Sequence, residues 1–290
     1  MNPQVQSFYD RATFTFTHVV YDRAGGRAAV VDPVLDFDPA TARTSTTSAD
    51  QVLAFVREKG LTVDWVLETH AHADHLTAAA HLKRETGAKV AIGQGITQVQ
   101  ERFRRLFGLE SEFATDGRQF DRLFADGDTF EIGELMAHVI GTPGHTDDSL
   151  TYVIGNAAFV GDTVFAPETG TARADFPGGD ARTLYRSIQR LFDLPGDTRL
   201  FLCHDYPPAE HEARAQSSLS EQRQHNVHLA SSTDEDAFVK MRTERDRSLA
   251  SPKLILPALQ VNIRAGELPP PDANGIRYLR LPLNQIGGAA

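Results

Sequence analysis

The chain has 290 residues, 41% of them hydrophobic, which is enough for a buried core in one domain or in one domain with an appendage. Its formal net charge of -10 argues against a nucleic-acid partner, which needs clustered lysines and arginines, although a local basic residue can still hold an anionic substrate. The one cysteine, Cys203, excludes an intramolecular disulfide and a cysteine-rich metal site.

The first half of the chain alternates strand and helix patterns. Its N-terminus has neither the basic nor the apolar region of a signal peptide, and no apolar run is long enough to span a bilayer, so we expect a cytoplasmic protein with no membrane partner. Apolar spacing predicts helices that end at Gly60 and Gly87. The expected strands are 14–21, 27–32, 63–67 and 89–92, the expected helices are 49–59 and 75–86, and 33–48 is expected to be a loop.

The second half repeats this rhythm. We expect strands at 135–140, 150–154, 157–160 and 199–202, a helix at 181–192, a hairpin-like turn at 129–133 and a tight turn at 143–146. Two strand-rich halves with helices outside predict an α/β fold, a four-layer αββα sandwich. After residue 210 the chain becomes polar and helical and then Pro-rich. We therefore predict a main domain over 1–210 and a helical, Pro-rich extension over 211–290 packed on it.

Polar side chains follow four of the predicted strands. The strand at 63–67 precedes the run H-A-H-A-D-H, and later strands precede P-G-H-T, G-D-T and H-D-Y. If these strand ends meet at one edge of the sheets, the ligand-type residues converge there. They are His70, His72, Asp74, His75, His145, Asp162 and His204. Imidazoles with a carboxylate suit Zn or Fe(II) better than Ca or Mg, and the spacing is compatible with one metal or with two bridged by Asp162.

The order of these motifs resembles that of the metallo-β-lactamase-fold family over about residues 13–206, which implies the same αββα sandwich. Narrower stretches resemble the persulfide dioxygenase branch of that family, the glutathione-dependent sulfur dioxygenases. These stretches are VVDPVLDFDP at 30–39, THAHADHLTAAAHL at 69–82, RADFPGGDARTLYRSI at 173–188 and CHDYPP at 203–208. Glyoxalase II is similar through the metal motifs, but it looks different after the G-D aspartate.

The resemblance implies one Fe(II) per chain, held by His70, His145 and Asp162 as a 2-His-1-carboxylate set. His72, Asp74, His75 and His204 would then orient these ligands or transfer protons, and the last three of them would be catalytic. The implied reaction oxidises glutathione persulfide with O2 to sulfite and glutathione, although coenzyme A or another small thiol could replace glutathione.

The resemblance also implies a substrate pocket in which Arg173 holds the glutathione anion and Tyr206 bonds its peptide part. Without the resemblance, a surface arginine and a core tyrosine would be the ordinary interpretations. Cys203 follows apolar residues in a predicted strand, so we expect a packed, inert thiol whose side chain points opposite to that of His204.

Two other functions remain open from the residues alone. One is a binuclear Zn or Fe hydrolase, a glutathione thioesterase of the glyoxalase II kind or a lactonase, in which Asp74, His75 and His204 bind the second ion. The other is a metal-binding sensor without turnover. The loop at 38–48 and the extension after residue 210 look like features of a bacterial subtype that animal persulfide dioxygenases lack. A homodimer is expected from the chain length and the extension.

Overall fold

Two six-stranded sheets form the centre of the computed structural model, which describes residues 2–110, 113–207, 211–229 and 233–285. The first sheet has the order β1 (Gln4–Asp10), β2 (Thr15–Tyr21), β3 (Arg27–Val31), β6 (Thr62–Leu67), β8 (Lys89–Gly93), β9 (Arg122–Phe124). The second has the order β10 (Thr129–Ile132), β11 (Leu135–Gly141), β12 (Leu150–Ile154), β13 (Ala157–Phe159), β14 (Arg199–Phe201), β15 (Gln216–Ser218). Buried side chains of both sheets, among them Leu67, Phe124 and Tyr152, pack together between them.

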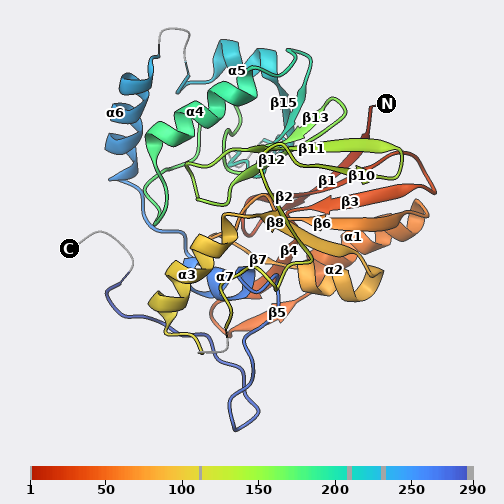
Figure 1. Cartoon of the computed structure of the whole chain (residues 1–290), viewed down its shortest axis with the longest axis vertical. Coiled ribbons are helices and arrows are strands. Elements are labelled where there is room, and N and C mark those ends of the chain that lie inside the picture. Colours follow the sequence, from red (N-terminus) through yellow and green to blue (C-terminus); the bar gives the residue numbers. More distant parts are fainter. Residues whose placement is uncertain (1, 111–112, 208–210, 230–232, 286–290) are drawn as a thin grey trace.

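Helices cover the outer face of each sheet, so the predicted four-layer α/β sandwich is confirmed (Figure 1). The first sheet packs against α1 (Thr47–Glu58), α2 (Ala79–Thr86) and α3 (Ile96–Phe107), and the second packs against α4 (Ala181–Phe192), α5 (Leu219–His225) and α6 (Glu235–Asp246). In α4 the buried residues Leu184, Ile188 and Leu191 recur at helical spacing, and Asp180 caps the helix by accepting from Thr183 N.

Three predicted elements were wrong because long-range pairing decides them. The expected loop at 33–48 contains two strands of a small third sheet, β4 (Val34–Asp38) and β5 (Arg43–Ser45). The third strand, β7 (Leu76–Thr77), pairs with β4, and so the helix expected from residue 75 begins only at Ala79. The expected turn at 129–133 is the strand β10, which pairs with β11.

The Pro-rich tail contains a buried helix, α7 (Ile255–Asn262), which the sequence reasoning missed. Its only proline, Pro257, lies in the first turn, where a missing N–H costs no intrahelical bond. Ala258 and Val261 are fully buried beside Leu76 of β7. Residues of the extension therefore complete three of the hydrophobic cores. The division at residues 210 and 211 stays a prediction, and Glu210 lies outside the described residues.

Candidate metal centre

The ligand-type residues follow four strands, β6, β11, β13 and β14, and they gather at one edge of the two sheets. β6 runs parallel to β8 in the first sheet, and β13 runs parallel to β14 in the second, so their carboxyl ends reach the same edge. A bridge between Thr15 and His204 joins the two sheets at this point. The structure brings together all seven candidates, which are His70, His72, Asp74, His75, His145, Asp162 and His204.

The first group consists of His70, His145 and Asp162, whose ligand atoms lie within 4.8 Å of one another. His145 Nδ1 donates to Arg173 O at 2.8 Å, which fixes the ring so that Nε2 faces Asp162 Oδ2 at 3.5 Å. His70 Nδ1 lies 3.0 Å from Thr69 Oγ1. His70 Nε2 is buried without a hydrogen-bond partner among the described residues, and Asp162 Oδ1 makes no hydrogen bond there, only an ion-pair contact with His204. Such orphaned atoms fit a metal ion, because buried polar atoms otherwise require a partner.

The second group consists of His72, Asp74 and His75, again with ligand atoms within 4.8 Å. His204 Nε2 lies 3.3 Å from Asp74 Oδ2 and 3.3 Å from Asp162 Oδ1. His75 Nδ1 is bonded to Leu76 O at 3.0 Å, and its buried Nε2 has no partner in the described structure. Asp162 thus directs one carboxylate oxygen toward His145 of the first group and the other toward His204, which lies beside Asp74 of the second group, so the same residues fit either one metal or two.

Burial sets the protonation of these rings. It lowers the pKa of His70 well below its usual value, and the neighbouring histidines lower it further. Burial and His72 lower the pKa of His75 to about 4. Both rings are therefore neutral near pH 7, the state that binds metal. Burial also lowers the pKa of His72, but the carboxylates of Asp32 and Glu68 outweigh it and raise that pKa to about 10.

The sequence did not identify the residues that support the turn at 69–75, which carries the histidine cluster. Asp32 lies in VVDPVLDFDP, where it was not assigned a role, and its backbone has a φ of 50°. Its buried carboxylate accepts from Thr69 N at 2.7 Å, Thr69 Oγ1 at 2.9 Å and His72 Nε2 at 3.0 Å. Asp148 Oδ2 accepts from Ala71 N at 2.8 Å. No local pattern identifies Asp148, because its partner is 77 residues away.

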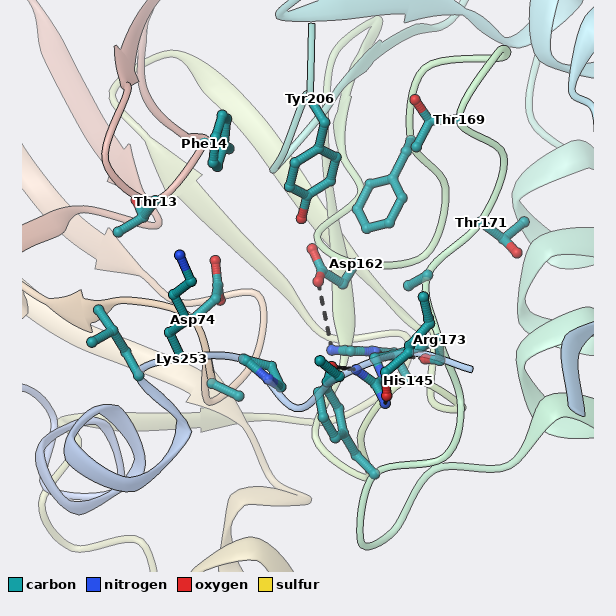
Figure 2. A pocket seen from close by; sticks show the side chains of 18 of the residues that line it. Thr13, Phe14, Asp74, His145, Asp162, Thr169, Thr171, Arg173, Tyr206 and Lys253 are labelled. Carbon is teal, nitrogen blue, oxygen red and sulfur yellow. Dashed lines mark hydrogen bonds and ion pairs between the residues drawn. The ribbon is translucent and has the colours of Figure 1, made fainter. Parts of the chain in front are cut away.

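A cavity of about 560 Å³ opens over the first group. Figure 2 shows Asp162 and His145 on its wall, with the ring of Tyr206 above Asp162. Asp74 also lines the cavity, and its aromatic lining is Phe14, Phe37, Phe165, Phe176 and Tyr206. A substrate that enters this cavity would therefore lie against His145 and Asp162 of the first group.

The two predicted substrate residues both line this cavity. The Arg173 guanidinium forms paired bonds with Asp175, at 2.6 and 2.8 Å, and donates to Ala250 O at 2.6 Å. An incoming anion would therefore have to compete with Asp175, and anion binding by Arg173 stays a prediction. About half of Tyr206 is exposed, but partial burial and the nearby carboxylates of Asp162 and Asp74 raise the pKa of its hydroxyl, which therefore remains a donor.

Cys203 is buried, which confirms the prediction of a packed thiol, but its direction differs from the one predicted. Its Sγ lies 3.5 Å from His204 Nε2, so the expectation that the two side chains point in opposite directions was wrong. β14 ends at Phe201, and strand alternation does not extend beyond it. Burial and the carboxylate of Asp32 raise the pKa of Cys203 well above its usual value, which keeps the thiol protonated.

A family model described as "Metallo-beta-lactamase superfamily" matches residues 12–204. The "Beta-lactamase hydrolase-like protein" of Xylella fastidiosa (strain Temecula1 / ATCC 700964) is 52% identical over 99% of this chain, which spans only 66% of that relative. "Glyoxylase B2" of Dictyostelium discoideum is 46% identical over 98% of both chains. "Persulfide dioxygenase ETHE1, mitochondrial" of Homo sapiens is 29% identical over 90% of this chain and 88% of its own.

Among solved structures, ETHE1 from Myxococcus xanthus matches with a TM-score of 0.72 and 30% identity, covering 91% of this chain and all of its own. The human match corrects one expectation. A match over 90% of 290 residues must include more than half of the 80 residues after residue 210, so the extension is not confined to a bacterial subtype. In the described part of the chain, every helix is too short or too polar to cross a bilayer.

Proposed function

The chain belongs to the metallo-beta-lactamase superfamily, whose members are metal-binding enzymes, and from this we propose that it is a non-haem Fe(II) dioxygenase acting on glutathione persulfide. The products would be sulfite and glutathione. The Myxococcus xanthus structure and the human relative support this branch. The relatives named hydrolase-like and glyoxylase share more of the sequence, so a hydrolase is the second candidate.

The observation that carries the proposal is the first group and its position on the cavity. Two histidines and one carboxylate converge within 4.8 Å, and two of the three residues line a 560 Å³ cavity. A set of three protein ligands would leave other coordination positions of Fe(II) free for O2 and substrate, as mononuclear Fe(II) oxygenases require. Bound there, Fe(II) would supply the redox chemistry with O2 that no side chain provides.

The protein's own residues would bind the substrate and manage protons. The reaction consumes one water with O2 and releases two protons as the persulfide becomes sulfite and glutathione. His204 Nε2 lies 3.3 Å from both Asp74 Oδ2 and Asp162 Oδ1, so a proton can be held among these atoms. The aromatic lining restricts water, and the Tyr206 hydroxyl can donate to the peptide part of the substrate.

The hydrolase candidate rests on the second group together with His204. Asp74 and His75 belong to one cluster of ligand atoms, and His204 Nε2 lies 3.3 Å from both Asp74 Oδ2 and Asp162 Oδ1. Asp74, His75 and His204 would therefore bind a second Zn or Fe ion. Two ions held by these residues would supply an activated hydroxide for the cleavage of a thioester or a lactone. This enzyme would contain two ions per chain, and His204→Ala would then remove a metal ligand.

The test is O2 uptake by the Fe(II)-loaded protein on addition of glutathione persulfide, with sulfite and bound iron measured in parallel. We expect rapid uptake, sulfite, one iron per chain, and a loss of about 100-fold or more in His145→Ala. His138→Ala is the matched control, because His138 is exposed on β11, the strand that leads to His145. Uptake no faster than without protein, together with two metals and cleavage of a glutathione thioester, would favour the hydrolase instead.

A further inference from the structure

One side chain of the C-terminal extension satisfies three backbone groups of the turn that carries the second group. Asn262, at the end of α7, donates through Nδ2 to His72 O and His75 O, both at 2.8 Å. Its Oδ1 accepts from Thr77 N at 2.8 Å. His72, His75 and Thr77 are all buried, so water does not provide these bonds.

The chemistry of this position selects a carboxamide. The turn presents two carbonyl oxygens and one N–H, and a carboxamide offers the complementary two N–H donors and one oxygen. An aspartate would place a carboxylate oxygen against two carbonyl oxygens. A leucine of similar size would leave all three backbone groups buried and unpaired.

The helix that carries Asn262 is itself firmly held. Ala258 and Val261 on its buried face pack against Leu76 of β7, and Gln100 donates to Ile263 O, just after the helix, at 2.9 Å. The chain after α7 also runs close to the turn, since a Cβ on Gly266 would lie 2.9 Å from Ala80 N and 3.1 Å from Thr77 O. Asn262 therefore connects the turn to a fixed support.

We propose that Asn262 is a positioning residue of the metal centre. By holding the peptide groups of His72 and His75, it sets the directions in which these two rings and the carboxylate of Asp74 between them project. Metal ligands must be placed to within a few tenths of an ångström. His70 of the first group lies two residues before His72 in the same turn, so a change in these peptide orientations would weaken metal binding at either group. The proposal rests on the proposed function only in requiring a metal centre, and it assigns a role to the extension.

The experiment measures metal affinity rather than turnover. Full-length protein is stripped of metal and titrated with Co(II) against a chromophoric chelator, and its visible absorption spectrum is recorded. Asn262→Asp and Asn262→Leu should raise the Kd for Co(II) by about 10- to 100-fold and alter the spectrum. Gln260→Leu is the matched control, since Gln260 is equally buried on the same helix but bonds to Arg280. It should leave the Kd within about twofold of the wild type.

The comparison with Gln260→Leu separates positioning from general destabilisation. The proposal is overturned if a folded Asn262→Asp protein has the wild-type Kd and spectrum, or if Gln260→Leu changes both equally. Failure of both Asn262 variants to fold would overturn it too, because Asn262 would then be a folding determinant. If the wild type consumes no O2 with glutathione persulfide while the Asn262 variants still weaken Co(II) binding, the proposed function fails and the positioning role stands.

Discussion

Replacement of Asp32 by asparagine should destabilise the metal-free protein strongly, because it removes the charge that balances His72. The Asp32 carboxylate and the His72 ring are both buried and meet at 3.0 Å. Burial raises the pKa of Asp32, but His72 and two bonds from Thr69 outweigh it, so the pKa lies below its usual value. Asparagine keeps the size of the side chain, so the change tests charge rather than packing.

Loss of one partner from a buried ion pair costs about 3–5 kcal/mol. With an m-value of about 3 kcal/mol/M, the urea midpoint of Asp32→Asn should fall by about 1 to 1.7 M. Urea titrations of stripped wild type and variant, followed by circular dichroism, measure this shift. The matched control is Asp148→Asn, which flanks the same turn. Burial raises the pKa of Asp148, so its negative charge contributes less to stability than that of Asp32. Asp148→Asn should therefore lower the free energy of unfolding by only about 1 kcal/mol.

The same ion pair predicts how the stability difference between wild type and Asp32→Asn depends on pH. The raised pKa of His72, about 10, means that its pairing contributes fully below the unfolded value near 6.5 and is lost as the pH rises through 10. The lowered pKa of Asp32 means that its contribution is lost only in acid. The difference between wild type and Asp32→Asn should therefore be largest near pH 5–6 and shrink toward pH 10. The argument would be refuted if Asp32→Asn lost no more unfolding free energy than Asp148→Asn. It would also be refuted if the loss in Asp32→Asn did not change up to pH 10.

Removal of bound metal by a chelator should lower the unfolding temperature in calorimetry, because it leaves buried atoms of both groups unpartnered; a ligand at 100 to 1,000 times its Kd contributes about 3–4 kcal/mol. Burial lowers the pKa of His18 to about 4, so the unfolded state takes up a proton before the folded state does. The free energy of unfolding should therefore fall by about 3 kcal/mol between pH 6.5 and 4, and urea titrations should show a smaller fall in His18→Gln. Asp246→Ala should cost about 3–5 kcal/mol, since it leaves the Arg242 guanidinium buried and unpaired, whereas Asp236→Ala on the same helix should cost under about 1 kcal/mol; equal costs would contradict this account.

The sequence predicted the parts of the site that are local. Strands β6, β11, β13 and β14 were located to within one residue at each end, and their ends carry the ligand-type residues. Apolar runs and turn residues specify such strands without reference to distant segments. The convergence of the ligand-type residues followed from the expectation that these strands end at one edge of the sheets.

The parts that were missed depend on distant partners. β4 and β7 exist because they pair with each other across about 40 residues, and neither has a strong pattern of its own. α7 was hidden by Pro257, whose effect depends on its place in the first turn. Asp32 and Asn262 act on a turn that lies 37 or more residues away, so their roles become visible only in three dimensions.

The residues shared by the two groups link metal content to the choice between the two proposed reactions. Asp162 faces His145 through Oδ2 and His204 through Oδ1, and His204 Nε2 also faces Asp74 Oδ2. Because His204 contacts both carboxylates, it would bind the second ion of a two-metal hydrolase but would bind no metal in a one-metal dioxygenase. Loss of His204 would therefore lower the metal content of the hydrolase and leave that of the dioxygenase unchanged.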